Sequence, residues 1–151
     1  MSAEKSCCVP AEASPAGACP SRVLKHAAFR WPGVPVRDYK SPADHWRGVS
    51  RMVLVGDRGE GTGFQVRYFE LQPGGFTSLE HHRHEHAVVV LRGSGEVRLG
   101  EATHALAFGD VVYVAAYDLH QFRNSSATEP FGFLCMVSAE RDQPTPVGDS
   151  G

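Results

Sequence analysis

The stretch Glu80-His81-His82-Arg83-His84-Glu85-His86 carries four of the eight histidines of the chain, together with two carboxylates. An apolar run that is typical of a β-strand, residues 87–91, follows it directly. Alternate side chains of an extended chain share a face, so a common cavity can receive the side chains of Glu80, His82, His84 and His86. Imidazole and carboxylate groups together bind Zn, Fe, Mn, Ni or Cu. The stretch therefore predicts a metal site, and the alternative is a solvated histidine-rich loop.

Short strand-like stretches separated by glycine-rich turns lie on both sides of the histidines. The strands that we expect are residues 51–55, 64–71, 76–80, 87–92, 96–99, 102–107, 111–114, 119–123 and 131–138. Pro73-Gly74-Gly75 is expected to turn the chain between the second and third of them. Many short strands with frequent glycine turns indicate a β-sandwich or β-barrel.

The length of 151 residues predicts one domain, and the ends of the chain differ in composition from its middle. Residues 1–22 are rich in Ala, Ser, Pro and Gly and are predicted to be a disordered tail. The domain proper is predicted at residues 23–140. It begins with an aromatic, proline-broken arm at residues 23–42 that should pack on the barrel. Residues 141–151 are polar and proline-rich and are predicted to be a loose tail.

Charge and hydropathy exclude several classes of partner. The formal net charge is −2, so there is no basic excess to bind phosphate backbones, and nucleic-acid binding is not expected. No apolar run approaches the length that crosses a bilayer, so no membrane partner is expected. The N-terminus lacks the apolar segment of a signal peptide, and a cytoplasmic location is the expectation.

The four cysteines do not have the spacing of a disulfide framework. Cys7 and Cys8 are adjacent in the predicted tail, where they could bind a soft metal or respond to oxidants. Cys135 stands alone in a late apolar strand, and we interpret it as a small buried apolar side chain.

The histidine stretch resembles the first motif of the cupin superfamily, a group of small double-stranded β-helix (jelly-roll) barrels. That motif has a glycine, two histidines, a glutamate and a second glycine at set spacings. Counting back from Gly93 places the glutamate position at His86, the histidine positions at His82 and Glu80, and the first glycine at Gly74. The spacing is kept, while two of the ligand types are changed.

A second cupin motif matches Gly109, His120 and Asn124 in register, although Ala115 and Tyr117 replace a proline and a glycine of the family. The resemblance covers residues 51–137 and implies an all-β cupin barrel. It also implies one divalent metal ion, of a kind that ligand type alone does not identify among Mn, Fe, Ni, Cu and Zn. The implied ligands are Glu80, His82, His86 and His120. This set is similar to the four-histidine branch of small bacterial cupins, with the first histidine exchanged for Glu80.

Four further residues are candidates for contacts near the metal. His84 has the parity of the ligands and is an alternate ligand or a partner of a ligand. Tyr68, Gln121 and Phe122 are candidate contacts to the ligands or to a substrate.

The resemblance and the open positions around such a metal predict a metal-dependent, dioxygenase-like oxidoreductase that acts on a small organic molecule. The alternative is a non-catalytic module that binds or senses a small ligand or the metal, and a third option is a barrel that has lost its metal. Small cupins commonly pair through an edge strand or an exchanged arm. A homodimer is therefore the expected assembly.

Overall fold

The computed structural model describes residues 19–40, 45–142 and 144–148, and within these residues all regular elements are strands. Nothing in this part of the chain is a helix of the length and apolar character needed to cross a membrane. Most of the predicted N-terminal tail, with Cys7 and Cys8, lies outside the described residues. The strands are β1 (Arg37–Asp38), β2 (Arg47–Val55), β3 (Phe64–Phe76), β4 (Glu80–His81), β5 (His86–Arg92), β6 (Gly95–Leu99), β7 (Ala102–Leu106), β8 (Val111–Val114), β9 (His120–Arg123), β10 (Phe131–Ser138) and β11 (Thr145–Pro146).

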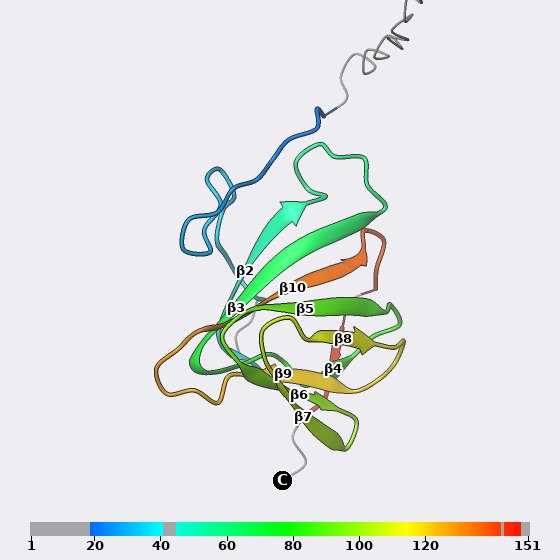
Figure 1. The fold of residues 1–151 in the computed structure, drawn as a ribbon. Helices are drawn as coiled ribbons and strands as arrows, with labels where there is room; N and C mark the ends of the chain where they lie inside the picture. The colour runs from blue at the N-terminus through cyan, green and yellow to red at the C-terminus, as the bar shows by residue number, and fades with distance from the viewer. Residues whose placement is uncertain (1–18, 41–44, 143, 149–151) are drawn as a thin grey trace, which may run out of the picture.

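The strands form two layers of one strongly curved antiparallel sheet (Figure 1). One layer contains β2, β3, β10, β5 and β8, each hydrogen-bonded to the next. The other layer contains β4, β9, β6 and β7. Strand β9 also pairs with the end of β3, and this pairing joins the layers. The all-β jelly-roll barrel predicted from the sequence is confirmed.

Strand β3 separates the two sides of the first layer, because successive side chains of a strand point to opposite faces. Phe69 and Leu71 point inward and pack with residues of β5 and β10 in the main core. Tyr68 points outward and belongs to a second apolar cluster, in which Trp31 and Val34 of the N-terminal arm cover β2. Burying each such large side chain contributes roughly 1.5–3 kcal/mol, so the arm is a substantial part of the folded domain.

The predicted break at Pro73-Gly74-Gly75 is wrong, since β3 continues through these residues to Phe76. Gly74 has a φ of +74°, a conformation that glycine adopts without the clash of a Cβ atom, and it bends the strand. The N–H of Gly74 donates to the carbonyl of Asn124, and the N–H of Asn124 donates to the carbonyl of Gly75. Beyond the bend, β3 pairs with β9, and the chain reaches the histidine stretch without a hairpin.

Candidate metal centre

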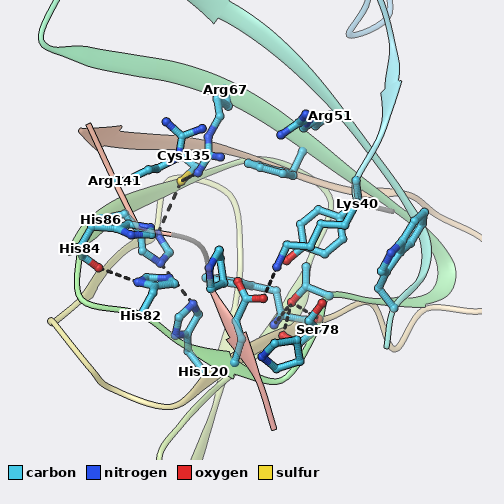
Figure 2. A pocket seen from close by; sticks show the side chains of 18 of the residues that line it. Lys40, Arg51, Arg67, Ser78, His82, His84, His86, His120, Cys135 and Arg141 are labelled. Atoms are coloured by element: carbon cyan, nitrogen blue, oxygen red, sulfur yellow. Dashed lines mark hydrogen bonds and ion pairs between the residues drawn. The ribbon is translucent and has the colours of Figure 1, made fainter. Parts of the chain in front are cut away.

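Three histidines, two from the stretch 80–86 and one from β9, converge in a pocket of the barrel (Figure 2). His82 follows β4, His86 begins β5, and His120 begins β9. Each offers one ring nitrogen, and the three nitrogens lie within 4.8 Å of one another. The Nε2 atoms of His86 and His120 are 3.3 Å apart. The structure therefore brings together three of the four ligands implied by the cupin resemblance.

The hydrogen bonds of two of these rings leave a lone pair directed at the centre. Nδ1 of His82 lies 2.6 Å from the carbonyl oxygen of His84, and Nδ1 of His120 lies 2.8 Å from that of Asp118. A carbonyl only accepts, so in each ring Nδ1 carries the proton and Nε2 is free to bind a metal.

Burial keeps the three imidazoles uncharged near neutral pH. Desolvation and the neighbouring His120 lower the pKa of His82 to about 4, and the same two causes lower the pKa of His86 to about 2. Burial also lowers the pKa of His120. Three neutral imidazoles that converge on one point are a donor set that fits a divalent transition-metal ion.

Glu80, the fourth predicted ligand, lies in the same pocket but outside this group of three. It is directly opposite His120 in the ladder between β4 and β9, and it is only 5% exposed. Its carboxylate is ion-paired with Lys40. The role of Glu80 as a metal ligand stays a prediction, because its carboxylate has a competing cationic partner.

His84 stacks on His82, with ring centroids 3.7 Å apart and an angle of 6° between the planes. Its Nδ1 lies 2.8 Å from a carboxylate oxygen of Asp142, which also accepts the backbone N–H groups of Arg83 and His84. The backbone N–H of Arg83, then the ring of His84, and then the backbone N–H of His84 lower the pKa of Asp142. Asp142 thus holds the loop between β4 and β5 in place. The sequence does not indicate this role, because the polar, proline-rich composition of residues 141–151 predicts a loose tail.

The other candidate contacts divide between the two sides of the sheet. Phe122 lines the pocket, and its contact with a ligand or substrate stays a prediction. Gln121, the preceding residue of β9, points to the opposite face, where it lines a small second pocket, and its amide donates to the carbonyl of Thr77. Tyr68 also points away from the histidines. Its hydroxyl donates to Glu70 on the outer face of β3.

The histidines occupy one side of a cavity of about 750 Å³. Cys135 lies beside them, with Sγ at 3.5 Å from Nδ1 of His86 and at 3.2 Å from Nη2 of Arg67, which donates to it (Figure 2). The interpretation of Cys135 as buried is correct, since it is 2% exposed, but its sulfur also lies at the wall of the pocket. The inward parity that it shares with Phe133 in β10 is the sequence signal that could have found it.

The barrel and its histidine centre define the class of protein. The chain belongs to the cupin superfamily, and the cupin domain family Cupin_2 matches residues 67–137. The chain is 45% identical over 117 residues to the 1-methylthio-D-xylulose 5-phosphate methylsulfurylase of Rhodospirillum rubrum, an alignment that covers 77% of this chain and 73% of that protein.

Two solved structures share the fold. A cupin-2 domain protein of Rhodospirillum rubrum is 41% identical, with a TM-score of 0.74 and 85% of each chain covered. A cupin 2 conserved barrel domain protein of Rhodopseudomonas palustris is 38% identical, with a TM-score of 0.75, and covers 85% of this chain and 88% of its own.

Proposed function

We propose that this protein is a metal-dependent enzyme that removes the methylthio group from a small phosphorylated keto sugar. The observation that carries the proposal is the placement of a thiol, Cys135, within 3.5 Å of one of three converging histidines. The substrate class comes from the relative in Rhodospirillum rubrum, whose name describes an activity on a 1-methylthio ketose phosphate.

The three histidines suit the carbonyl of such a substrate. A divalent ion held by His82, His86 and His120 would polarise the carbonyl group and stabilise negative charge on its oxygen. The carbonyl of a 1-methylthio 2-ketose stands next to the carbon that carries the sulfur, so this carbon can accept an electron pair when its bond to sulfur breaks.

Cys135 is the nucleophile in this proposal. Its sulfur attacks the sulfur of the methylthio group, so that an S–S bond forms and the C–S bond breaks. The electron pair of the broken bond goes to the sugar carbon, which takes up the proton that the thiol has lost. The products are the deoxy ketose and a methyl disulfide on Cys135.

A second thiol completes the cycle. A small thiol reductant attacks the methyl disulfide, leaves with the methylthio group as a mixed disulfide, and returns Cys135 to the thiol. In total the sugar carbon is reduced and the external thiol is oxidised. Arg67 supports the first attack, because its Nη2 donates to Sγ of Cys135 at 3.2 Å and holds the sulfur in place in the pocket wall.

The test is an assay of metal-loaded protein with a 1-methylthio ketose phosphate and a thiol reductant, followed by mass spectrometry of the sugar. Wild type should produce the deoxy ketose phosphate, and Cys135→Ser should lose activity by on the order of 1,000-fold while its metal content stays the same. Cys19→Ser is the matched control, since Cys19 is a free thiol that precedes the arm. Absence of product with wild type would reject the proposal, and full activity of Cys135→Ser would reject the role of the thiol.

A dioxygenase-like oxidoreductase remains the second candidate. Three neutral histidines without a bound carboxylate leave room for both a small substrate and O₂ at the ion, which supports it. Uptake of O₂ by the metal-loaded protein in the presence of thiols, diketones or phenols would favour this reaction. A tightly held ion with no reaction in either assay would favour the non-catalytic binding module.

We further propose a homodimer in the cytoplasm with a small molecule as the only partner. The proposal is supported by the cupin fold and by an aromatic arm that packs on the barrel. Sedimentation at micromolar concentration should give twice the mass of the chain, and a monomer would contradict it.

A further inference from the structure

Three arginines from three segments line the wall of the pocket beside Cys135. Arg51 comes from β2, Arg67 from β3, and Arg141 from the segment after β10 (Figure 2). Arg51 lies opposite Phe69 in the β2–β3 ladder, and Arg67 lies two residues before Phe69 on the same face. The two guanidinium groups are therefore diagonal neighbours that point into one cavity.

These three guanidinium groups have few close partners in the part of the chain that the structure describes. None of the ion pairs found there includes Arg51, Arg67 or Arg141. The Nε atoms of Arg51 and Arg67 are buried, and among the described residues neither has a hydrogen-bond partner. Within the described ranges, Arg141 donates only to a backbone carbonyl, that of Ser138, at 3.2 Å. The three side chains are half-buried, and buried N–H donors such as these two Nε atoms are rare unless a partner binds them.

The cluster is unfavourable in the absence of an anion. Burial lowers the pKa of Arg51, and the charge of Arg67 lowers it further. Burial lowers the pKa of Arg141, and the charges of Arg67 and Arg51 act in the same direction. An anion that entered the cavity would relieve both effects, because it would replace lost water and offset the repulsion.

The acids of the pocket are already bound to other groups. The carboxylate of Glu80 is paired with Lys40. The carboxylate of Asp142 is held by the ring of His84 and by two backbone N–H groups of the adjacent loop. The anion that the arginines would bind therefore comes from a ligand.

We propose that Arg51, Arg67 and Arg141 form the subsite that binds the phosphate group of the substrate. The identity of the substrate rests on the proposed function, whereas the anion site rests on the arginines alone. Three guanidinium groups offer more N–H donors than the two oxygens of a carboxylate can accept, and they match a dianionic phosphate with three terminal oxygens. Cys135 contacts both Arg67 and His86. A molecule that bound to the arginines at one end and to the histidine centre at the other would therefore lie next to the thiol.

The experiment is a calorimetric titration of the full-length protein with inorganic phosphate, in metal-loaded and metal-free form. Wild type should bind phosphate in both forms. Arg51→Gln and Arg141→Gln should each weaken binding by about tenfold or more, and the double variant should show no measurable binding. Arg141→Lys should bind phosphate with an affinity between those of wild type and Arg141→Gln, because lysine keeps the charge but lacks the two parallel N–H donors of a guanidinium group. Arg98→Gln is the control, because Arg98 lines a different, small surface pocket and bonds to Gly100.

Each contrary result has a distinct meaning. No binding by wild type, binding that vanishes when the metal is removed, or unchanged binding by the double variant would overturn the subsite. If the variants lose phosphate as expected but wild type does not release the methylthio group, the subsite stands and the proposed function fails. If wild type releases that group while the double variant binds phosphate normally, the proposed function stands and the subsite fails.

Discussion

Two clusters of charged side chains lie on opposite faces of β3, and they differ in how their charges are balanced. On the outer face, Glu70 is 2% exposed and accepts hydrogen bonds from Arg30, Arg92 and Tyr68 at 2.9–3.2 Å. On the inner face, Arg51 and Arg67 have buried Nε atoms without partners in the described residues.

The outer cluster has a structural role. Arg30 belongs to the N-terminal arm, so its two contacts with Glu70 fasten the arm to the barrel beside Trp31 and Val34. The inner cluster forms no ion pair among the described residues, and it faces the cavity that holds the histidines and Cys135. The comparison indicates that a buried carboxylate with its partners in place serves the fold, and it supports the proposal that half-buried guanidinium groups with unpartnered Nε atoms bind a ligand.

Substitutions at the histidine pocket and on the outer face of β3 should differ most in their effect on the affinity for a divalent ion. His120→Ala removes one of three imidazoles, so the affinity for a divalent ion should fall on the order of 100-fold or more. Competition with a chelator measures it. Glu70→Ala is the control, and its folded form should bind the ion as wild type does. If wild type and His120→Ala bind the ion with equal affinity, His120 is not a metal ligand.

Loss of the outer carboxylate should have the largest effect on stability. Glu70→Ala leaves the buried part of Arg92 and the hydroxyl of Tyr68 without their acceptor, and the free energy of unfolding should fall by about 3–5 kcal/mol. Urea denaturation measures this change. Glu101→Ala, at a side chain that is 98% exposed, should change the free energy by less than about 0.5 kcal/mol. A similar small change for Glu70→Ala would show that the outer network is dispensable.

Acid should weaken the outer cluster in a defined direction. Burial acts to raise the pKa of Glu70, but hydrogen bonds from Arg30 and Tyr68 outweigh it and hold the pKa below its ordinary value of 4.5. A lowered folded-state pKa gives stability that is present above 4.5 and is lost as the pH falls through the folded value. The difference in unfolding free energy between wild type and Glu70→Gln should therefore shrink below that pH. A constant difference down to acid pH would contradict the ion pair.

The carboxylate of Glu80 gives a smaller test within the pocket. If it joins the histidines when the ion binds, Glu80→Gln should lower metal affinity by about tenfold. Lys40→Met should raise the affinity, since the competing cation is gone. The same chelator competition measures both affinities. If neither variant changes the affinity, Glu80 is not a metal ligand and the histidines alone bind the ion.

The smallest effect should come from the inner arginines. Arg51→Met removes one of several like charges that have no carboxylate partner, so the free energy of unfolding should stay within about 1 kcal/mol of wild type or rise. Thermal denaturation in a phosphate-free buffer measures it. A loss well beyond this would mean that Arg51 has a structural partner, and the contrast between the two faces of β3 would be lost.

Much of the fold could be predicted from the sequence because it depends on local patterns. Apolar alternation and glycine turns give the strands, and the spacing of Gly74, His82, His86 and Gly93 gives the first cupin motif. The prediction was wrong at Pro73 to Gly75, where a single bend at Gly74 continues β3. Turn-forming residues mark a change of direction, but only the neighbouring strand decides whether the ladder resumes.

The candidate site could be predicted in part. Three histidines were found because two lie close together in the chain and the third lies in a matching motif. Arg51, Arg67, Arg141 and Cys135 were missed, because each is an ordinary residue in its own segment. Tyr68 and Gln121 were candidate contacts, and the sequence did not show that both point away from the histidines.

The sequence by itself determined the cupin barrel and the histidines at its centre, since strand alternation and motif spacing are properties of neighbouring residues. Only the tertiary structure decided which charges are paired. Glu70 meets Arg30 from the arm, whereas Arg67 meets Arg51, Arg141 and Cys135 from three other segments. Electrostatic balance depends on distances of a few ångströms between atoms that are remote in the chain, and those distances exist only once the strands have closed into the barrel.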